Sequence, residues 1–96
     1  MKHYILKDHI VIEEPNLMRW AKWFESADRI VKQTEIGRSK VSTVFLGLDH
    51  SFGHGLHLLF ETMVFGGPTA GEQERYETWE EAEAGHEQMV KDVKGA

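Results

Sequence analysis

The sequence has 96 residues, enough for a single domain spanning residues 1–96 around one hydrophobic core. Apolar residues make up 41% of the chain and aromatic residues 10%, which excludes a disordered acidic tail. No run of about 18 apolar residues occurs, which argues against a membrane span. The absence of cysteine excludes disulfides and thiolate metal sites. The first residues show no signal peptide, so we expect a cytoplasmic protein.

The formal net charge of -5 is concentrated in one part of the chain. Residues 72–88 hold seven glutamates and one arginine, whereas residues 1–71 are balanced. Glutamates near the start of a helix stabilise its positive end, which is the favoured interpretation. The alternative is an acidic surface for a basic partner, with Glu80 and Glu83 as candidate binding residues. No comparable basic stripe exists, so we expect no direct nucleic-acid binding.

The N-terminal part predicts a hairpin and then a helix. Residues 4–6 and 10–12 are short β-prone runs, and Pro15 with Asn16 ends the second run and begins a helix of about three turns. Trp23 lies at the border of the apolar face of this helix, where half-buried packing is favoured over a binding role. The apolar face itself consists of Leu17, Trp20, Ala21, Phe24 and Ala27.

The middle of the chain predicts three antiparallel strands over residues 29–36, 40–49 and 58–66. Two helices are expected to cover one face of this sheet. Period-two alternation then divides the strand residues between the two faces. We expect a half-apolar open face, offered as a candidate binding surface, which carries Thr43, Phe45, Glu61, Met63 and Phe65.

The C-terminal part predicts a glycine-bearing loop from Gly66 to Tyr76, followed by a helix over residues 79–94. Thr78 and Glu81 fit a capping box at the start of that helix. His86 lies at the centre of its apolar face, where a neutral, hydrogen-bonded core histidine is favoured over a catalytic base.

Three segments together resemble a family of short uncharacterised proteins of bacteria and bacteriophages. The segments are residues 41–50 (VSTVFLGLDH), residues 59–67 (LFETMVFGG) and residues 74–86 (ERYETWEEAEAGH). The helix over residues 17–25 shares the likeness, which therefore covers most of the chain. The resemblance implies a single-domain fold and a phage context, and it supplies no mechanism.

One loop gathers side chains that suit a divalent metal. Asp49, His50, His54 and His57 offer nitrogen and oxygen ligands of the kind that zinc or nickel prefers. Their spacing matches no standard metal motif, a glycine-rich loop holds ligands poorly, and His54 and His57 depart from the pattern of the resembled family. A solvated loop is therefore favoured over a metal site.

The sequence as a whole predicts an α+β domain with three central antiparallel strands, which the N-terminal hairpin extends if it forms. The favoured function is a non-enzymatic protein-interaction or accessory module that needs no cofactor. A homodimer through the open face is favoured over the alternative that the N-terminal segment around Tyr4 and residues 10–12 folds over this face and covers it. The alternative function is a small metal- or histidine-dependent enzyme that uses the loop at Asp49 and His50.

Overall fold

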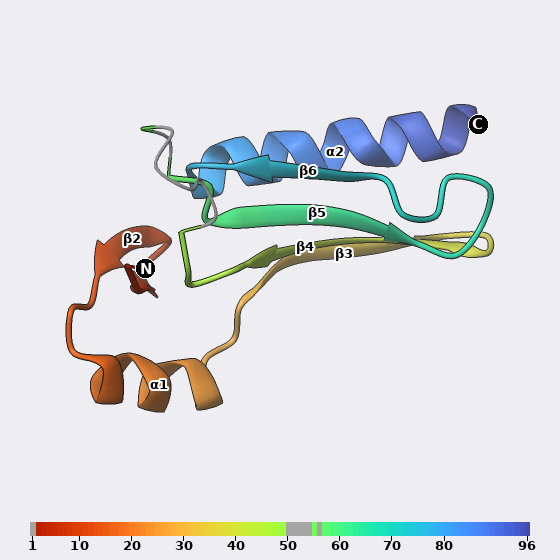
Figure 1. Ribbon diagram of the computed structural model, residues 1–96. Coiled ribbons are helices and arrows are strands. Elements are labelled where there is room, and N and C mark those ends of the chain that lie inside the picture. The colour runs from red at the N-terminus through yellow and green to blue at the C-terminus, as the bar shows by residue number, and fades with distance from the viewer. Residues whose placement is uncertain (1, 50–54, 56) are drawn as a thin grey trace.

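The computed structural model describes residues 2–49, 55 and 57–96. It is an α+β fold with two helices and two antiparallel sheets (Figure 1). The smaller sheet is a hairpin, and the larger has four strands in the order β3-β4-β5-β6. In chain order the elements are β1 (Tyr4–Lys7), β2 (Ile10–Glu13), α1 (Leu17–Ser26), β3 (Ile30–Ile36), β4 (Ser39–Phe45), β5 (Phe60–Phe65), β6 (Gln73–Tyr76) and α2 (Trp79–Gly95).

The expected N-terminal hairpin and helix are both present. Asp8 and His9 join β1 to β2 with φ angles of 51° and 67°, as a two-residue type I′ turn requires. The side chain of Asn16 accepts a hydrogen bond from the backbone N–H of Arg19 and so caps the start of α1. Local chemistry therefore explains both the turn of the hairpin and the start of α1.

The expectation that two helices share one face of the sheet is wrong. Only α2 lies across the four-stranded sheet, whereas α1 packs beside β1 at one end of the molecule (Figure 1). The indole Nε1 of Trp20 donates to the carbonyl of Tyr4, and the ring of Phe24 packs against the backbone at Gly47. The apolar face of α1 therefore packs against the hairpin and against the segment that follows β4.

The loop expected over residues 66–76 contains a fourth strand, β6, at the edge of the sheet. The chain reverses at Gly66 and Gly67, whose φ angles of 71° and 75° favour glycine. A Cβ at Gly66 would lie 2.4 Å from the carbonyl oxygen of Arg38, so this turn packs closely on the one between β3 and β4. Polar residues dominate Gln73–Tyr76, which is typical of an edge strand. Because the segment lacks an alternating apolar pattern, the sequence gives no sign of this strand.

The core lies between the sheet and α2. Phe45 and Thr43 are fully buried there, so the assignment of both residues to the open face is wrong. Register explains the correction, because Phe45 pairs with Phe60 and Thr43 pairs with Thr62, and paired residues point to the same side of a sheet. Two clusters make up this core: Tyr4, Phe45, Leu59, Phe60 and Ala82 in one, and Val41, Val64, Met89, Val90 and Val93 in the other.

Gly85 allows α2 to approach the sheet closely. A Cβ at this position would lie 2.2 to 2.3 Å from the ring and hydroxyl of Tyr76, which is far inside van der Waals contact. The ring of Tyr76 would have to turn aside, or the helix move away, to make room for an added carbon. The glycine that interrupts the helical pattern is therefore a packing requirement.

We expect Gly85→Ala to lower the free energy of unfolding by about 2 kcal/mol, because overpacking outweighs the gain in helix propensity. Chemical denaturation measures the change. Gly95→Ala is the matched control: it lies in the same helix with nothing within 4 Å of an added Cβ, so its stability stays close to wild type. Equal stability of the two variants would contradict the contact with Tyr76.

Candidate functional site

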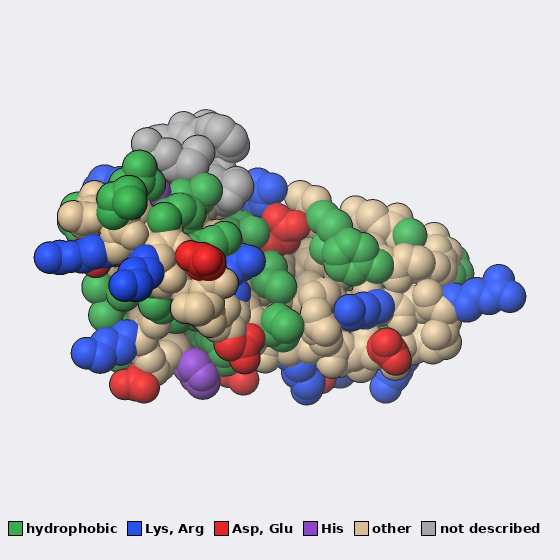
Figure 2. Space-filling model, turned by 90° about the horizontal axis from the view of Figure 1, so that it is seen from below, with side chains coloured by type: hydrophobic (Ala, Val, Ile, Leu, Met, Phe, Trp, Pro, Cys, Tyr) green, Lys and Arg blue, Asp and Glu red, His purple; other side chains and the backbone are tan. Residues whose placement is uncertain are grey.

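The face of the sheet opposite α2 carries apolar side chains that the rest of the described chain leaves exposed. The alternation of β5 places Glu61, Met63 and Phe65 on this face, as expected, and β4 adds Val44 in place of Phe45. Phe65 is 50% exposed, and Ile30, which pairs with Val44, is 48% exposed. Figure 2 looks onto this side of the molecule, where apolar side chains form separate groups among polar ones.

Glu61 has a partner on this face, the side chain of Arg75. Its carboxylate accepts a hydrogen bond of 3.1 Å from Nε of Arg75, the residue opposite it on β6. The Glu61 side chain is 14% exposed and that of Arg75 is 32% exposed. A partly shielded ion pair of this kind orients both side chains and leaves the neighbouring apolar groups open.

The N-terminal hairpin does not cover the open face. Tyr4 is buried in the core cluster that contains Phe45 and Ala82, and Leu6 and Val11 pack against the same cluster. The ring of His9 stacks on Trp79 at the start of α2, with 3.6 Å between ring centroids. The hairpin is therefore held at the α2 side of the sheet end, and Met63 and Phe65 are left without it.

His86 is a core histidine with both ring nitrogens hydrogen-bonded. Nδ1 lies 2.7 Å from the hydroxyl of Thr43, and Nε2 lies 2.8 Å from the hydroxyl of Thr34. Thr43 in turn bonds Thr62 at 2.5 Å, so four side chains form one chain of hydrogen bonds. Hydroxyl groups both donate and accept, so either neutral tautomer is satisfied. Complete burial of the ring confirms the expected core role.

Burial lowers the pKa of His86; the nearby Lys32 lowers it further, and Glu87 opposes the change. Below its ordinary pKa of 6.5 the unfolded chain takes up a proton at this ring, whereas the folded chain does not. We therefore expect the free energy of unfolding to be fully retained above pH 6.5 and to fall as the pH is lowered towards 5. Denaturation at a series of pH values measures this dependence.

His86→Gln is the comparison for this titration, since glutamine keeps hydrogen-bonding groups but has no ionisable ring. The variant is less stable overall, and its stability varies less with pH between 7 and 5 than that of wild type. Parallel curves for the two proteins would contradict a neutral, buried His86.

The acidic segment is divided between two elements. Glu80 and Glu83 are exposed on α2, as expected for binding candidates. The Glu81 side chain accepts from the hydroxyl of Thr78, which also accepts from the Glu81 backbone N–H, so these two residues cap the helix. Glu87 bonds Lys32 at 2.5 Å, and this contact lowers the pKa of its carboxyl. Two glutamates of the acidic segment, Glu81 and Glu87, thus make contacts that stabilise the fold.

Trp23 is a packing residue in this structure. Its ring meets that of Phe45 edge-on with 5.9 Å between centroids, and it borders the core cluster. This position agrees with the favoured interpretation of half-buried packing rather than with a binding role.

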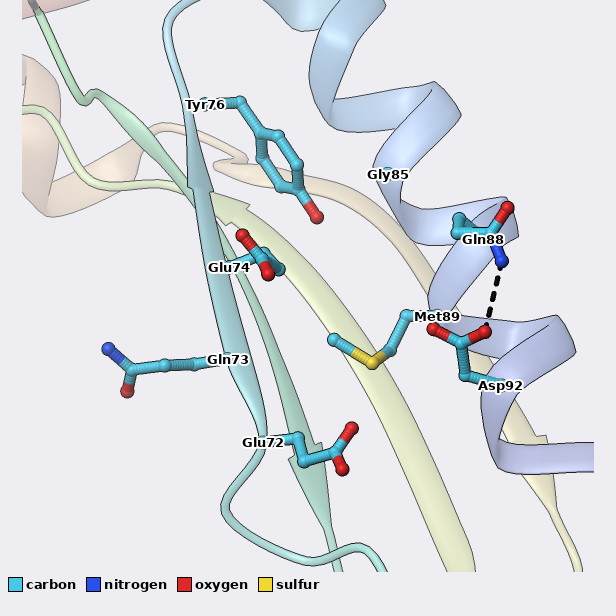
Figure 3. A pocket seen from close by; sticks show the side chains of 8 residues that line it. All are labelled: Glu72, Gln73, Glu74, Tyr76, Gly85, Gln88, Met89 and Asp92. Carbon is cyan, nitrogen blue, oxygen red and sulfur yellow. Dashed lines mark hydrogen bonds between the residues drawn. The ribbon is translucent and has the colours of Figure 1, made fainter. Parts of the chain in front are cut away.

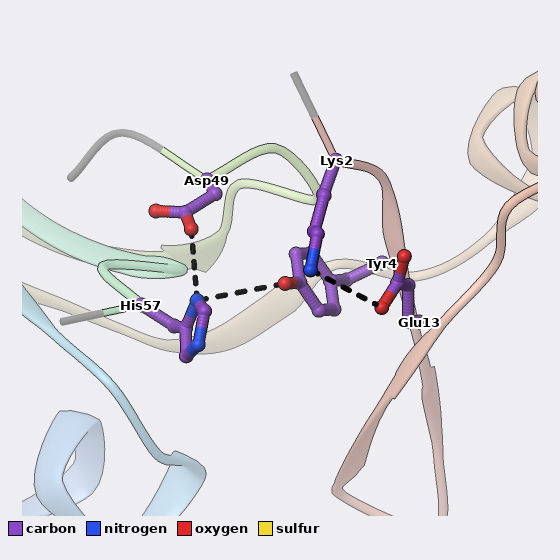
Figure 4. Close-up of polar contacts among 5 residues, drawn as sticks. All are labelled: Lys2, Tyr4, Glu13, Asp49 and His57. Carbon is purple, nitrogen blue, oxygen red and sulfur yellow. Dashed lines mark hydrogen bonds and ion pairs between the residues drawn. The ribbon is translucent and has the colours of Figure 1, made fainter. Parts of the chain in front are cut away.

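Two of the candidate metal ligands come together at the end of the sheet (Figure 4). Nδ1 of His57 lies 2.8 Å from Oδ2 of Asp49 and 3.5 Å from the hydroxyl of Tyr4. An ionised carboxylate only accepts, so Nδ1 carries a proton and the neutral ring keeps its lone pair on Nε2. Burial raises the pKa of Tyr4, and Glu13 and Asp49 raise it further, so the phenol stays protonated at neutral pH.

The structure describes two of the four candidate metal ligands, Asp49 and His57. His50 and His54 lie outside the described residues. Among residues 2–49, 55 and 57–96, no three histidine, aspartate or glutamate side chains are grouped to hold a metal ion. The two described candidates, Asp49 and His57, contact each other, and His57 lines a cavity of about 380 Å³ together with Tyr4 and Glu77.

Comparisons with known proteins give no match: no family, no curated protein and no solved structure corresponds to this chain. Neither described helix is both long and apolar enough to cross a membrane.

The sequence did not indicate two features of these surfaces. The sequence presents Arg75 only as one charge within the acidic segment, because its pattern predicts a loop where β6 lies. Tyr76 and Gly85 come into contact across a groove between β6 and α2, which no short motif announces. The one available signal was the glycine inside a helical pattern, which often marks close packing.

Proposed function

We propose that this chain is a non-enzymatic protein-interaction module that forms a homodimer through the open face of its four-stranded sheet. The observation that carries the proposal is a sheet face with exposed Phe65 and Ile30 that α1, α2 and the hairpin leave uncovered. Large apolar side chains left exposed on one uncovered sheet face are typical of an interface. An accessory role of phage origin in the cytoplasm is consistent with the resemblance found in the sequence.

A two-fold dimer suits this face in particular. Symmetry places each patch against its own copy, so one set of residues shields both Phe65 side chains at once. The Glu61–Arg75 pair lies beside the apolar groups and supplies both signs of charge to the rim. Each copy thus offers an arginine to the glutamate of its partner, which favours one orientation over others.

We expect wild type to sediment as a dimer at micromolar concentration and Phe65→Lys to weaken the dimer by at least about tenfold. The added lysine places a charge at the centre of the interface while leaving the α2 side of the sheet intact. Sedimentation velocity and circular dichroism together measure association and folding.

Met18→Lys is the control for this test, because Met18 lies on α1 and, at 77%, is the most exposed large apolar residue in the described part of the chain. It should sediment like wild type. A monomeric wild type, or a dimer that only Met18→Lys dissociates, would exclude the open face as the interface.

The contact between Asp49 and His57 favours a second candidate function, a histidine- or metal-dependent enzyme. A carboxylate that accepts from Nδ1 fixes the ring so that Nε2 faces outward as a base or a ligand. The adjoining cavity and the Tyr4 hydroxyl give a small molecule room and one further hydrogen-bonding group.

Metal analysis of protein purified without a histidine tag separates the two functions. The interaction module predicts less than stoichiometric zinc or nickel. Stoichiometric metal in wild type and in His9→Ala, lost in His57→Ala or His50→Ala, would replace the first proposal with the second.

A further inference from the structure

A groove of about 490 Å³ lies between β6 and α2, on the side of β6 that faces away from the proposed dimer interface (Figure 3). Glu72, Glu74 and Tyr76 point from β6 towards the helix, whereas Gln73 points in the other direction. Gln88 and Asp92 of α2 form the opposite wall. The groove is therefore a second surface, separate from the open face.

The groove combines negative charge with an apolar floor. Glu72, Glu74 and Asp92 line it, and neither lysine nor arginine is among the described residues around it. Met89 is 5% exposed and lies between the two walls, as Figure 3 shows. A lysine side chain matches this arrangement, because its alkyl stem packs on a thioether while its ammonium group reaches the carboxylates.

Tyr76 lies at one end of the groove, where its ring faces Gly85 of α2. Its hydroxyl oxygen is buried. Burial raises the pKa of Tyr76, whereas a side-chain hydrogen bond with Thr62 lowers it in part. The aromatic ring thus bounds the groove at this end.

The backbone beside the groove is also available for pairing. β6 is the outermost strand of the sheet, and within the described chain β5 is its only neighbour. An edge strand presents a row of N–H and C=O groups to a further strand. An extended peptide that pairs there directs every second side chain to the α2 side of the sheet, next to Glu72 and Glu74.

We propose that this groove is a docking site for an extended, lysine-bearing segment of a protein partner, which pairs with the free edge of β6 and places its ammonium groups among Glu72, Glu74 and Asp92. The proposal goes beyond self-association and does not depend on it, since Gln73 and Arg75 on the opposite side of β6 belong to the other surface. Exposed carboxylates make the affinity sensitive to salt.

The probe is an acetylated and amidated octapeptide of alternating lysine and threonine, titrated into the full chain by calorimetry. Glu72→Gln with Glu74→Gln should weaken binding about fivefold, as the loss of two exposed charge pairs predicts. Glu80→Gln with Glu83→Gln removes the same charge from α2 outside the groove and is the matched control, with affinity close to wild type. Equal losses in the two double variants would overturn the site.

Two further measurements separate this mode of binding from general charge attraction. Methylation of alternate peptide nitrogens removes the backbone donors of one edge, and we expect it to abolish binding. A methylated peptide, or spermidine, that binds as tightly as the unmodified peptide would overturn strand pairing.

Discussion

The docking of α2 on the sheet is the constraint on which the other features depend. His86 lies at its centre, bonded to hydroxyls of β3 and β4 and completely buried. Gly85, the residue before it, brings the helix backbone against the ring of Tyr76 on β6. These two neighbouring positions hold the helix against β3 and β4 towards one edge of the sheet and against β6 at the other edge. They therefore fix both the distance of α2 from the sheet and its rotation about its own axis.

This docking determines which surfaces the chain exposes. One helix covers one face, and α1 is engaged with the hairpin and the end of β4, so no helix is left for the other face. Because α2 is held close at Gly85 and farther along presents Gln88 and Asp92, a groove opens between it and β6. β6 therefore separates two surfaces of different chemistry, one apolar with an ion pair and one acidic.

Local chemistry predicted much of the fold. Asn16 and Thr78 began their helices as the sequence indicated, and the turn at Gly37 joined two expected strands. Alternation sorted β5 correctly but placed Phe45 on the wrong face, because period two defines two sets of residues without saying which set meets the helix. The register between β4 and β5 decides which residues of β4 share a face with Phe60 and Thr62. This register depends on the long connection from β4 to β5, whose path the alternation of residues does not reveal.

The candidate sites were harder to predict for the same reason. Glu61 was expected on the open face and lies there, but its partner Arg75 belongs to a strand whose polar sequence looked like a loop. Asp49 and His57 were grouped by proximity in the chain, and they do meet, whereas Tyr4 joins them only through the folded hairpin. Contacts between distant segments are fixed by packing and not by spacing.

Three methionines lie on three different surfaces, and their methyl resonances therefore test directly whether the chain self-associates through the open face of the sheet. Met63 lies on the open face, Met89 forms the floor of the groove and Met18 is exposed on α1. As the protein concentration is raised, the methyl resonance of Met63 should shift and broaden in nuclear magnetic resonance spectra, while those of Met18 and Met89 stay in place. A Met63 signal that does not change with concentration, or a shift confined to Met18, would contradict self-association through the sheet.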